Sequence, residues 1–339
     1  MEPIILSSNQ PPARFYLGGE QISTFRNGAA SKQPRTPEDW IASTTTCRGH
    51  SSLGLSRLSD GTLLIEAIKE KPLVWLGSEH IATFGVDTKL LVKLIDAGQR
   101  LPVHAHPSAT FASTHIGASH GKAEAWYILT PGEVYLGLRD DVSVEKLLTL
   151  IDAQDVESLL GLMHRVSVTP HQTVYVPPGL LHAIGKGILL AEVQEPEDLS
   201  ILLEWRDFAI DGRVEGHLGL GFEKALLGVE RCGRTKEEIS PLVNRNTLPA
   251  QSNEYFRLDF VSVQEKEEQI EAGFAVLIVL KGAFDILSEV SKTINIIAGS
   301  TVVIPYAIGK FTLHGSGEVL IARPPKPKLS ISEFSKSHI

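Results

Sequence analysis

The sequence predicts a mainly β protein made of two β-barrel domains, with a small helical insertion in the first. Three observations predict this fold. Short runs rich in β-branched and aromatic residues recur in both halves, separated by turns that contain glycine or proline. The most extended helical spacing of apolar residues lies inside the first half. The 339 residues exceed what one hydrophobic core usually fills, which favours two cores.

Composition and charge are those of a folded, cytoplasmic protein. Hydrophobic residues make up 42% of the chain and charged residues 21%. The net charge is −8 without a run of lysine or arginine, so we expect neither nucleic acid nor a membrane as partner. Apolar runs such as FAVLIVL are too short to span a bilayer, and the first residues lack a signal-peptide pattern. Cys47 and Cys232 form no CxxC, which favours a reducing compartment.

The first hundred residues predict short elements that lead into a strand. Residues 1–35 favour a short strand or two with loops, and Thr36–Ser43 alternates around Trp40 as an edge strand does. From Thr62, TLLIEAIKE has helical spacing, and KPLVWLG then predicts a turn or short strand. The run Thr88–Gly98 predicts a strand that ends at its glycine.

The middle of the chain predicts further strands around one helical insertion. Ser108–Gly121 is small and polar and predicts a loop, and AEAWYIL after it predicts a strand. Ser143–His164 predicts two helices, broken near Asp152–Asp155. Strand-like runs then resume with RVSVTP, TVYVPP, GILLAEVQ and LSILLEW.

These patterns predict a division into domains. The first predicted part is a metal-binding barrel over residues 1–210, with the helical insert at about 143–164. A connection over 211–250 follows, with a helix near Phe222–Val229. The last parts are a second barrel over 251–326 and a poorly ordered or edge-packed tail over 327–339. Turns in the second barrel are expected at Lys281–Gly282, Ala298–Gly299 and Gly315–Gly317.

Three histidines and a glutamate predict a metal site in the first barrel. His104 and His106 are two apart, so both imidazoles point to one face of a strand. Glu124 lies on the next strand, and His182 follows the turn Pro177–His182. Three imidazoles and a carboxylate suit zinc, iron or manganese.

The spacings match the two motifs of a cupin barrel. Five residues separate Gly98 from His104 in the first motif, and Pro177-x-Gly179-x-x-His182 ends the second. Two departures stand out: Glu124 comes eighteen residues after His106, and His171 stands where the second motif usually has glycine. Five further histidines are interpreted as structural, namely His115, His120, His164, His217 and His314.

Longer motifs resemble the type I mannose-6-phosphate isomerases, most closely their short bacterial form. TPEDWIAS compares with the family's pSExWExS, LPVHAHP with LSVQVHP, and Gly121–Ile128 with GKxExWYI. Val176–Gln194 compares with vPxGxxHAlgxG…lExQ. The resemblance covers most of the chain and implies a double cupin whose second domain holds no metal. It also implies interconversion of mannose 6-phosphate and fructose 6-phosphate through a cis-enediol, with one divalent ion, zinc first and manganese or iron as alternatives.

The resemblance also implies roles for individual residues. The ligands fall on His104 (a glutamine in the family), His106, Glu124 and His182. Lys122 is expected to act as an electrostatic partner or a proton relay, and Glu192 as the base or as a carboxylate that orients a ligand. Trp40 and Trp126 are expected to form walls of the pocket or to pack in the core.

Two departures from the family bear on the phosphate. The serine before the family's glutamine is Pro102, and the family's pocket arginine falls on Leu202. Arg206 is four positions further on, on the same strand face by parity, and is a candidate replacement. The alternative for Arg206 is a surface ion pair with Asp207 or Glu204.

The expected partner is therefore a small sugar or sugar phosphate, bound by a monomer or homodimer. Alternative functions are isomerisation of a different or unphosphorylated sugar, iron-dependent oxygen chemistry, and sugar binding without turnover. Isomerase assays across phosphorylated and free sugars, with metal exchange and oxygen uptake, separate these alternatives.

Overall fold

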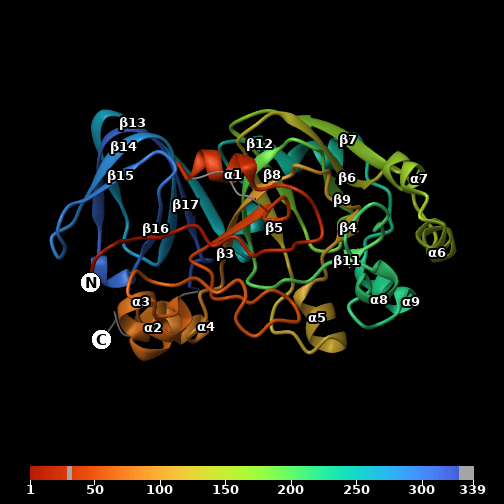
Figure 1. Cartoon of the computed structure of the whole chain (residues 1–339), viewed down its shortest axis with the longest axis horizontal. Coiled ribbons are helices and arrows are strands. Elements are labelled where there is room, and N and C mark those ends of the chain that lie inside the picture. Colours follow the sequence, from red (N-terminus) through yellow and green to blue (C-terminus); the bar gives the residue numbers. More distant parts are fainter. Residues whose placement is uncertain (29–32, 328–339) are drawn as a thin grey trace, which may run out of the picture.

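The computed structural model describes residues 1–28 and 33–327 as two β-rich halves that lie side by side (Figure 1). The second half carries the long blue strands, and the first half carries the strands coloured yellow to green. The mainly β prediction is confirmed. Beyond residue 327, the predicted tail lies outside the described residues.

The first half contains two antiparallel sheets that face each other across the predicted metal site. One has the order β12-β8-β5-β10-β3-β2, and the other has the order β11-β4-β9-β6-β7. The strands of the first sheet are β2 (Glu38–Ile41), β3 (Leu91–Asp96), β5 (Glu124–Ile128), β8 (Gln172–Val176), β10 (Leu189–Gln194) and β12 (Val243–Arg245). Those of the second are β4 (His104–Ala105), β6 (Gly132–Leu138), β7 (Met163–Val168), β9 (His182–Ile184) and β11 (Ile201–Leu202).

The second half is built on one strongly bent sheet. Its strands are β1 (Ile4–Ile5), β13 (Arg257–Ile270), β14 (Ala275–Leu287), β15 (Ile294–Ile297), β16 (Thr301–Ile304) and β17 (Phe311–Arg323). Lys281–Gly282 and Gly315–Gly317 lie inside β14 and β17, so the turns predicted there are wrong. They are bends: Gly282 has a φ of +77°, and a Cβ on it would lie 2.0 Å from the Ser316 carbonyl oxygen.

Two short strands cross the predicted domain boundaries. β1, at the N-terminus, pairs with β16 of the second half. β12, in the predicted connection, pairs with β8 of the first half. Backbone hydrogen bonds therefore hold the N-terminal segment to the second half and the connection to the first half.

The helices of the first hundred residues lie in two places in Figure 1: α2, α3 and α4 lie below the second half, and α1 lies in the upper middle, between the two halves. They are α1 (Glu20–Phe25), α2 (Leu64–Glu70), α3 (Pro72–Leu76) and α4 (Ser78–Phe84). The helix predicted from Thr62 is confirmed as α2. KPLVWLG forms α3 instead of a turn or strand, since proline is compatible with a first helical turn and Trp75 and Leu76 become buried.

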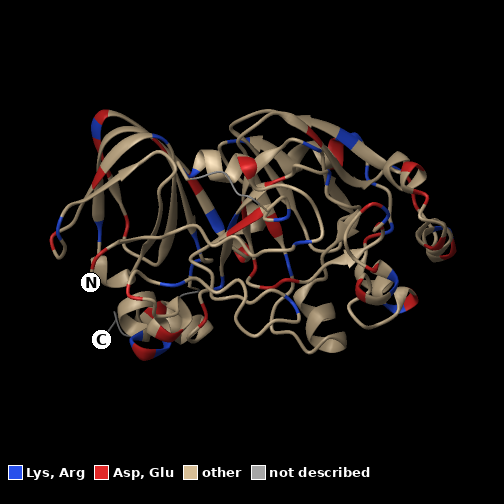
Figure 2. Ribbon diagram, viewed as in Figure 1, with Lys and Arg blue, Asp and Glu red and all other residues tan. Residues whose placement is uncertain are grey.

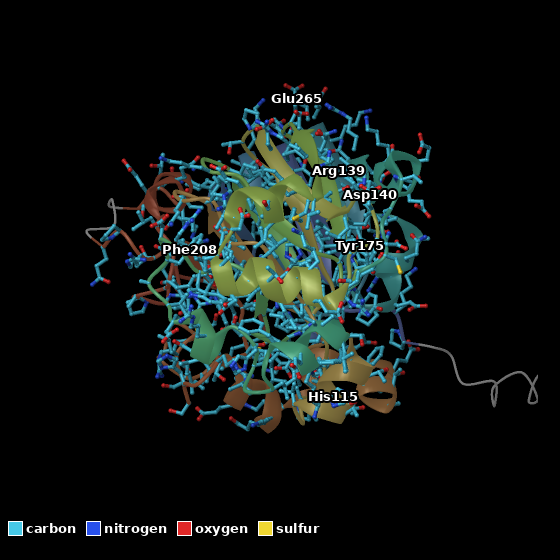
Figure 3. All side chains as sticks on the ribbon, turned by 90° about the vertical axis from the view of Figure 1, so that its right-hand side faces the viewer. His115, Arg139, Asp140, Tyr175, Phe208 and Glu265 are labelled. Carbon is cyan, nitrogen blue, oxygen red and sulfur yellow. The ribbon has the colours of Figure 1, made fainter. Side chains whose placement is uncertain are left out.

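The predicted loop Ser108–Gly121 also contains a helix, α5 (Ala109–His115). The Ser108 side chain accepts a hydrogen bond from the Phe111 backbone N–H and caps it. The small residues of this segment weaken the apolar period that would have predicted a helix, and only Ala112 is buried. Figure 3 shows His115 at the lower edge of the molecule.

The predicted helical insertion is present as α6 (Val144–Ala153) and α7 (Val156–Gly161). Ser143 and Asp155 cap the two helices, and Gln154 separates them in the left-handed region. The insertion ends earlier than predicted, because β7 already begins at Met163. In Figure 3 the helices lie across the front of the molecule.

Short helices fill the connection between the halves and one corner of the second. They are α8 (Gly212–Glu215), α9 (Phe222–Ala225), α10 (Lys236–Ile239) and the 3₁₀ turns Leu226–Gly228, Ser240–Leu242, Ala250–Glu254 and Tyr306–Ile308. Figure 2 shows acidic and basic positions interspersed over both halves. In the described part of the chain, no helix is long and apolar enough to cross a membrane.

Candidate metal centre and its cavity

The three predicted imidazoles meet in the structure. One ligand atom from each of His104, His106 and His182 lies within 4.8 Å of the others, and all three side chains are buried. His104 on β4 is paired directly with His182 on β9, which brings their ring centroids to 4.0 Å. The Gly179 backbone N–H donates to the His106 carbonyl at 2.7 Å, so the Pro-Pro-Gly turn is fixed against the first motif.

Backbone carbonyls orient all three rings in the same way. The Nδ1 atoms of His104, His106 and His182 lie 2.8, 2.7 and 2.9 Å from the carbonyl oxygens of Pro102, Leu199 and Leu180. A carbonyl can only accept, so each Nδ1 donates and the neutral ring keeps its lone pair on Nε2. Such bonds fix the tautomer that a metal ligand needs.

Burial keeps two of these rings neutral. Desolvation, with the neighbouring His182 and His106, holds the pKa of His104 well below its usual range. Desolvation and the ammonium of Lys122 lower the pKa of His106 to about 3. Both imidazoles are therefore in the form that binds a metal ion at neutral pH.

Glu124 adds a carboxylate to the three rings. Its Oε2 is 2.9 Å from His106 Nε2, and its Oε1 is 3.3 Å from His182 Nε2. Burial opposes its ionisation, but Lys122 and His106 outweigh that effect and hold the pKa of Glu124 well below its ordinary value. Trp126 Nε1 donates to Oε1 at 3.0 Å and orients the carboxylate.

The donor set fits a metal ion. His182 Nε2 is buried and makes no hydrogen bond with the described residues, although it faces Glu124 Oε1. With Nδ1 as the donor, both atoms present lone pairs, and two buried lone pairs repel unless a proton or a cation lies between them. Three nitrogens and one carboxylate oxygen suit zinc, manganese or iron.

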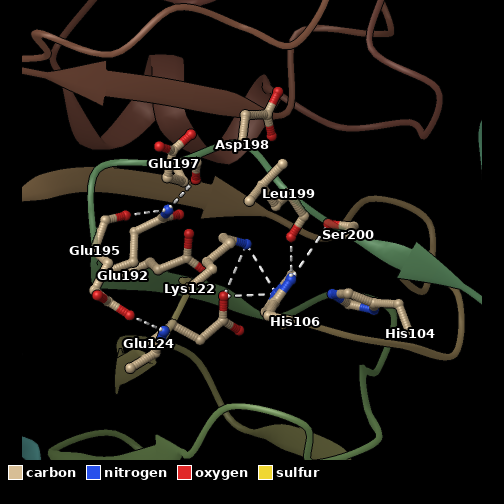
Figure 4. A network of polar contacts seen from close by, with 12 residues as sticks. His104, His106, Lys122, Glu124, Glu192, Glu195, Glu197, Asp198, Leu199 and Ser200 are labelled. Carbon is tan, nitrogen blue, oxygen red and sulfur yellow. Dashed lines mark hydrogen bonds and ion pairs between the residues drawn. The ribbon is translucent and has the colours of Figure 1, made fainter. Parts of the chain in front are cut away.

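Lys122 lies among the same atoms (Figure 4). Its Nζ donates to His106 Nε2 at 2.8 Å and forms an ion pair with Glu124 Oε2 at 2.9 Å. Lys122 and Glu124 are two residues apart, and both line the cavity.

The cluster opens into a cavity of ≈ 380 Å³. Four of the predicted site residues line it: His104, Lys122, Glu124 and Glu192. The apolar residues of its lining include Phe15, Leu202 and Leu218. Phe208, labelled in Figure 3, packs edge to face against Phe15, with the two ring centroids 6.3 Å apart.

Trp40 and Trp126 lie behind the cavity and do not line it. Both are fully buried. Trp40 Nε1 donates to Glu38 Oε2 at 2.7 Å, which repeats the arrangement of Trp126 with Glu124 two residues away. Each indole therefore packs in the core and orients a carboxylate of the site.

Arg206 lies outside the cavity. Its side chain is exposed, and its backbone N–H donates to Gln154 Oε1 at 2.9 Å. Leu202, at the family's arginine position, is buried and forms part of the cavity wall. The structure thus brings the metal ligands, Lys122 and Glu192 together, and leaves Arg206 apart from them.

The sequence reading missed a buried ion-pair network in the cavity. Lys93 Nζ on β3 lies 3.3 Å from Glu192 Oε1, 3.8 Å from Glu38 Oε2 and 4.7 Å from the centre of the Trp40 ring. Burial opposes its charge, but Glu192 and Glu38 outweigh burial and raise the pKa of Lys93. The signal was the lysine among the apolar residues of LVKLID, because a buried lysine in a protein is usually paired with an opposite charge.

A second cluster of charged side chains stabilises the loop that contains Leu199, whose carbonyl orients His106. His120 Nε2 lies 2.6 Å from Asp87 Oδ2, and Nδ1 lies 3.5 Å from Glu197 Oε1. Burial opposes protonation, yet hydrogen bonds to Asp87 and Glu197 raise the pKa of His120 to about 9. Leu199, whose carbonyl orients His106, is two residues beyond Glu197.

This cluster predicts a loss of stability at alkaline pH. The pKa of His120 is higher in the folded state than its ordinary value, so its contribution is complete below about pH 6.5 and disappears as pH rises through about 9. The His120→Gln variant should lose ~1–2 kcal/mol of unfolding free energy at pH 6, since partial exposure screens the pair, and almost none at pH 10. Urea unfolding at pH 6 and at pH 10 measures the loss of unfolding free energy, and the exposed His314→Gln variant is the control. An equal loss at both pH values would contradict the prediction.

Comparisons with known proteins agree with this geometry. No family model matches the chain. It is 28% identical over 312 residues to "Probable mannose-6-phosphate isomerase GmuF" of Bacillus subtilis, covering 88% of this chain and 92% of that protein. It is 36% identical over 204 residues to mannose-6-phosphate isomerase of Streptococcus mutans, covering 58% of each.

A solved structure shares the whole fold. The mannose 6-phosphate isomerase of Bacillus subtilis superposes with a TM-score of 0.75 over 95% of this chain and 100% of that one, at 24% identity. At this identity the likeness supports the fold alone. The chain is therefore similar in sequence to mannose-6-phosphate isomerases and has the fold of the solved one.

Proposed function

We propose that the chain is a metal-dependent aldose–ketose isomerase that interconverts mannose 6-phosphate and fructose 6-phosphate, with zinc as its metal. The observation that carries this proposal is the placement of His104 and Glu124 on the same cavity surface as Lys122 and Glu192. A metal-ligand set and two proton-handling side chains thus face one space large enough for a hexose.

The reaction moves a proton between C1 and C2 of the sugar through a cis-enediol, so it needs a group that takes the proton and returns it. A divalent ion held by the three histidines and Glu124 would stabilise negative charge on the enediolate oxygen as a Lewis acid. Burial and the nearby Glu124 raise the pKa of Glu192 above its usual value, toward the range of a useful base. We assign the proton transfer to Glu192.

Lys122 and Lys93 set the charge around that base. The Lys93 ammonium is 3.3 Å from Glu192 Oε1 and fixes the carboxylate in the cavity floor. The Lys122 ammonium pairs with Glu124 and donates to His106, so it supplies positive charge beside the reacting oxygens.

We expect metal-loaded protein to convert mannose 6-phosphate into fructose 6-phosphate, and the reverse. NMR measures this conversion after the zinc, manganese and iron forms have been incubated with phosphorylated and free hexoses. Thermal stabilisation by sugar without conversion would instead indicate a sugar-binding cupin. Oxygen uptake by the iron form would indicate an oxygenase.

A second candidate is isomerisation of an unphosphorylated sugar. The observation that favours it is Leu202, which gives the cavity an apolar wall where the family has arginine. Conversion of free mannose with no preference for the phosphorylated sugar would establish this candidate.

A further inference from the structure

We propose that Arg48 binds the phosphate of the substrate at the mouth of the cavity, in place of the arginine that the family has at the position of Leu202. This proposal rests on the proposed isomerase function and adds the residue that would select a phosphorylated sugar. Arg48 and Leu202 line the same cavity, although they lie far apart in the sequence.

Arg48 is the lining cation whose charge is left available. The other lining cations each have a carboxylate within 4.0 Å: Arg14 has Glu38 and Asp198, Lys93 has Glu38 and Glu192, and Lys122 has Glu124. Among the described residues, Arg48 forms no such ion pair. Its guanidinium makes one hydrogen bond, from Nη2 to the Leu218 carbonyl at 3.3 Å.

The backbone fixes the position of Arg48 relative to the metal ligands. Its N–H donates to Asp198 Oδ2 at 3.0 Å. Asp198 precedes Leu199, whose carbonyl accepts from His106 Nδ1. Arg48 is thus tied to the loop that orients a metal ligand, while its side chain is exposed at the rim.

The shape of the substrate matches this separation. The reacting carbons C1 and C2 are at one end of a hexose 6-phosphate, and the phosphate on C6 is at the other. With C1 and C2 beside the buried His104 and Glu124, the phosphate is directed toward the rim. A guanidinium has five donors in a planar fork, and Arg48 uses one of them, which leaves a pair for a phosphate.

Five acidic residues share the cavity lining, and four of them already lie within 4.0 Å of another lining cation, namely Glu38, Glu124, Glu192 and Asp198. Glu215 is exposed, so solvent and salt screen its repulsion of a phosphate. Among the described residues, no aspartate or glutamate side chain forms an ion pair with the Arg48 guanidinium within 4.0 Å.

The test compares KM with kcat in the metal-loaded full chain. Arg48→Gln should raise the KM for mannose 6-phosphate by about 10- to 100-fold, because it removes a charge-assisted hydrogen bond, with kcat changed less than about threefold. Arg48→Lys should recover part of the loss, since it keeps the charge without the fork. Arg165→Gln, an exposed arginine on β7, is the control for loss of one positive charge and should match the wild type.

Binding of inorganic phosphate, measured by calorimetry, separates this proposal from the proposed function. Weaker phosphate binding in Arg48→Gln supports the site even if no sugar is converted. An unchanged KM and unchanged phosphate affinity in Arg48→Gln overturn it while leaving isomerase activity intact. The same loss in Arg206→Gln, with Arg48→Gln unaffected, would also overturn it and return the phosphate to Arg206.

Discussion

The His182→Ala variant is expected to lose both its metal and its activity. His182 supplies one of three ring nitrogens within 4.8 Å of one another, and its Nδ1 is already held by the Leu180 carbonyl. A site left with two imidazoles and Glu124 binds zinc far more weakly. Because a bound ion contributes several kcal/mol of charge stabilisation, turnover should fall by at least about 10³-fold. Metal analysis after gel filtration, with parallel isomerase assays, measures both losses.

His164→Ala is the matched control. His164 is also a buried histidine, but its Nε2 donates to the Arg234 carbonyl at 2.6 Å and takes no part in the cluster. We expect it to lower stability and to keep full metal content. Loss of turnover in His182→Ala with metal content unchanged would show that His182 is not a ligand.

The metal centre could be predicted because the geometry of a strand determines which side chains share a face. Residues two apart share a face, which placed His104 beside His106 and Lys122 beside Glu124. The Pro-Pro-Gly turn predicted the return of His182, and Gly179 has the positive φ, +86°, that this turn needs. His171 adopts a φ of +70°, so it keeps the backbone shape of the glycine that cupin motifs have at that position.

The parity argument for Arg206 shows where such reasoning ends. It assumed that the strand continued from Leu202, but β11 contains only Ile201–Leu202, and the chain then leaves the sheet. Once a strand ends, side-chain direction no longer alternates by position. Arg206 therefore faces solvent instead of the cavity.

The missed cavity residues share a different cause. Arg14, Arg48 and Asp198 come from irregular segments, where no period predicts direction, and they meet only through long-range contacts. The helices α3 and α5 were missed because short elements are stabilised by burial and capping more than by propensity.

The Lys93→Met variant tests whether this network holds the cavity floor together. Lys93 is buried between Glu38 and Glu192, and methionine keeps its length without its charge. Glu38 keeps Arg14 and the hydroxyl of Tyr16 at 2.9 Å, but Glu192 loses its nearest cation. Removing one partner of a buried pair usually costs about 3–5 kcal/mol, so we expect a loss of this size in urea unfolding.

Two further variants decide whether the loss comes from the stranded carboxylate. Adding Glu192→Gln to Lys93→Met should recover part of the stability, because no uncompensated charge then remains in the floor. Lys310→Met, which removes an exposed pair with Glu271, should change stability by less than about 0.5 kcal/mol. If the double variant is as unstable as Lys93→Met alone, lost packing around Trp40 and not the charge of Glu192 is the cause. Lys93 would then contribute mainly by packing in the core. The Glu192 carboxylate, to which we assign the proton transfer, would need another partner to hold it in place.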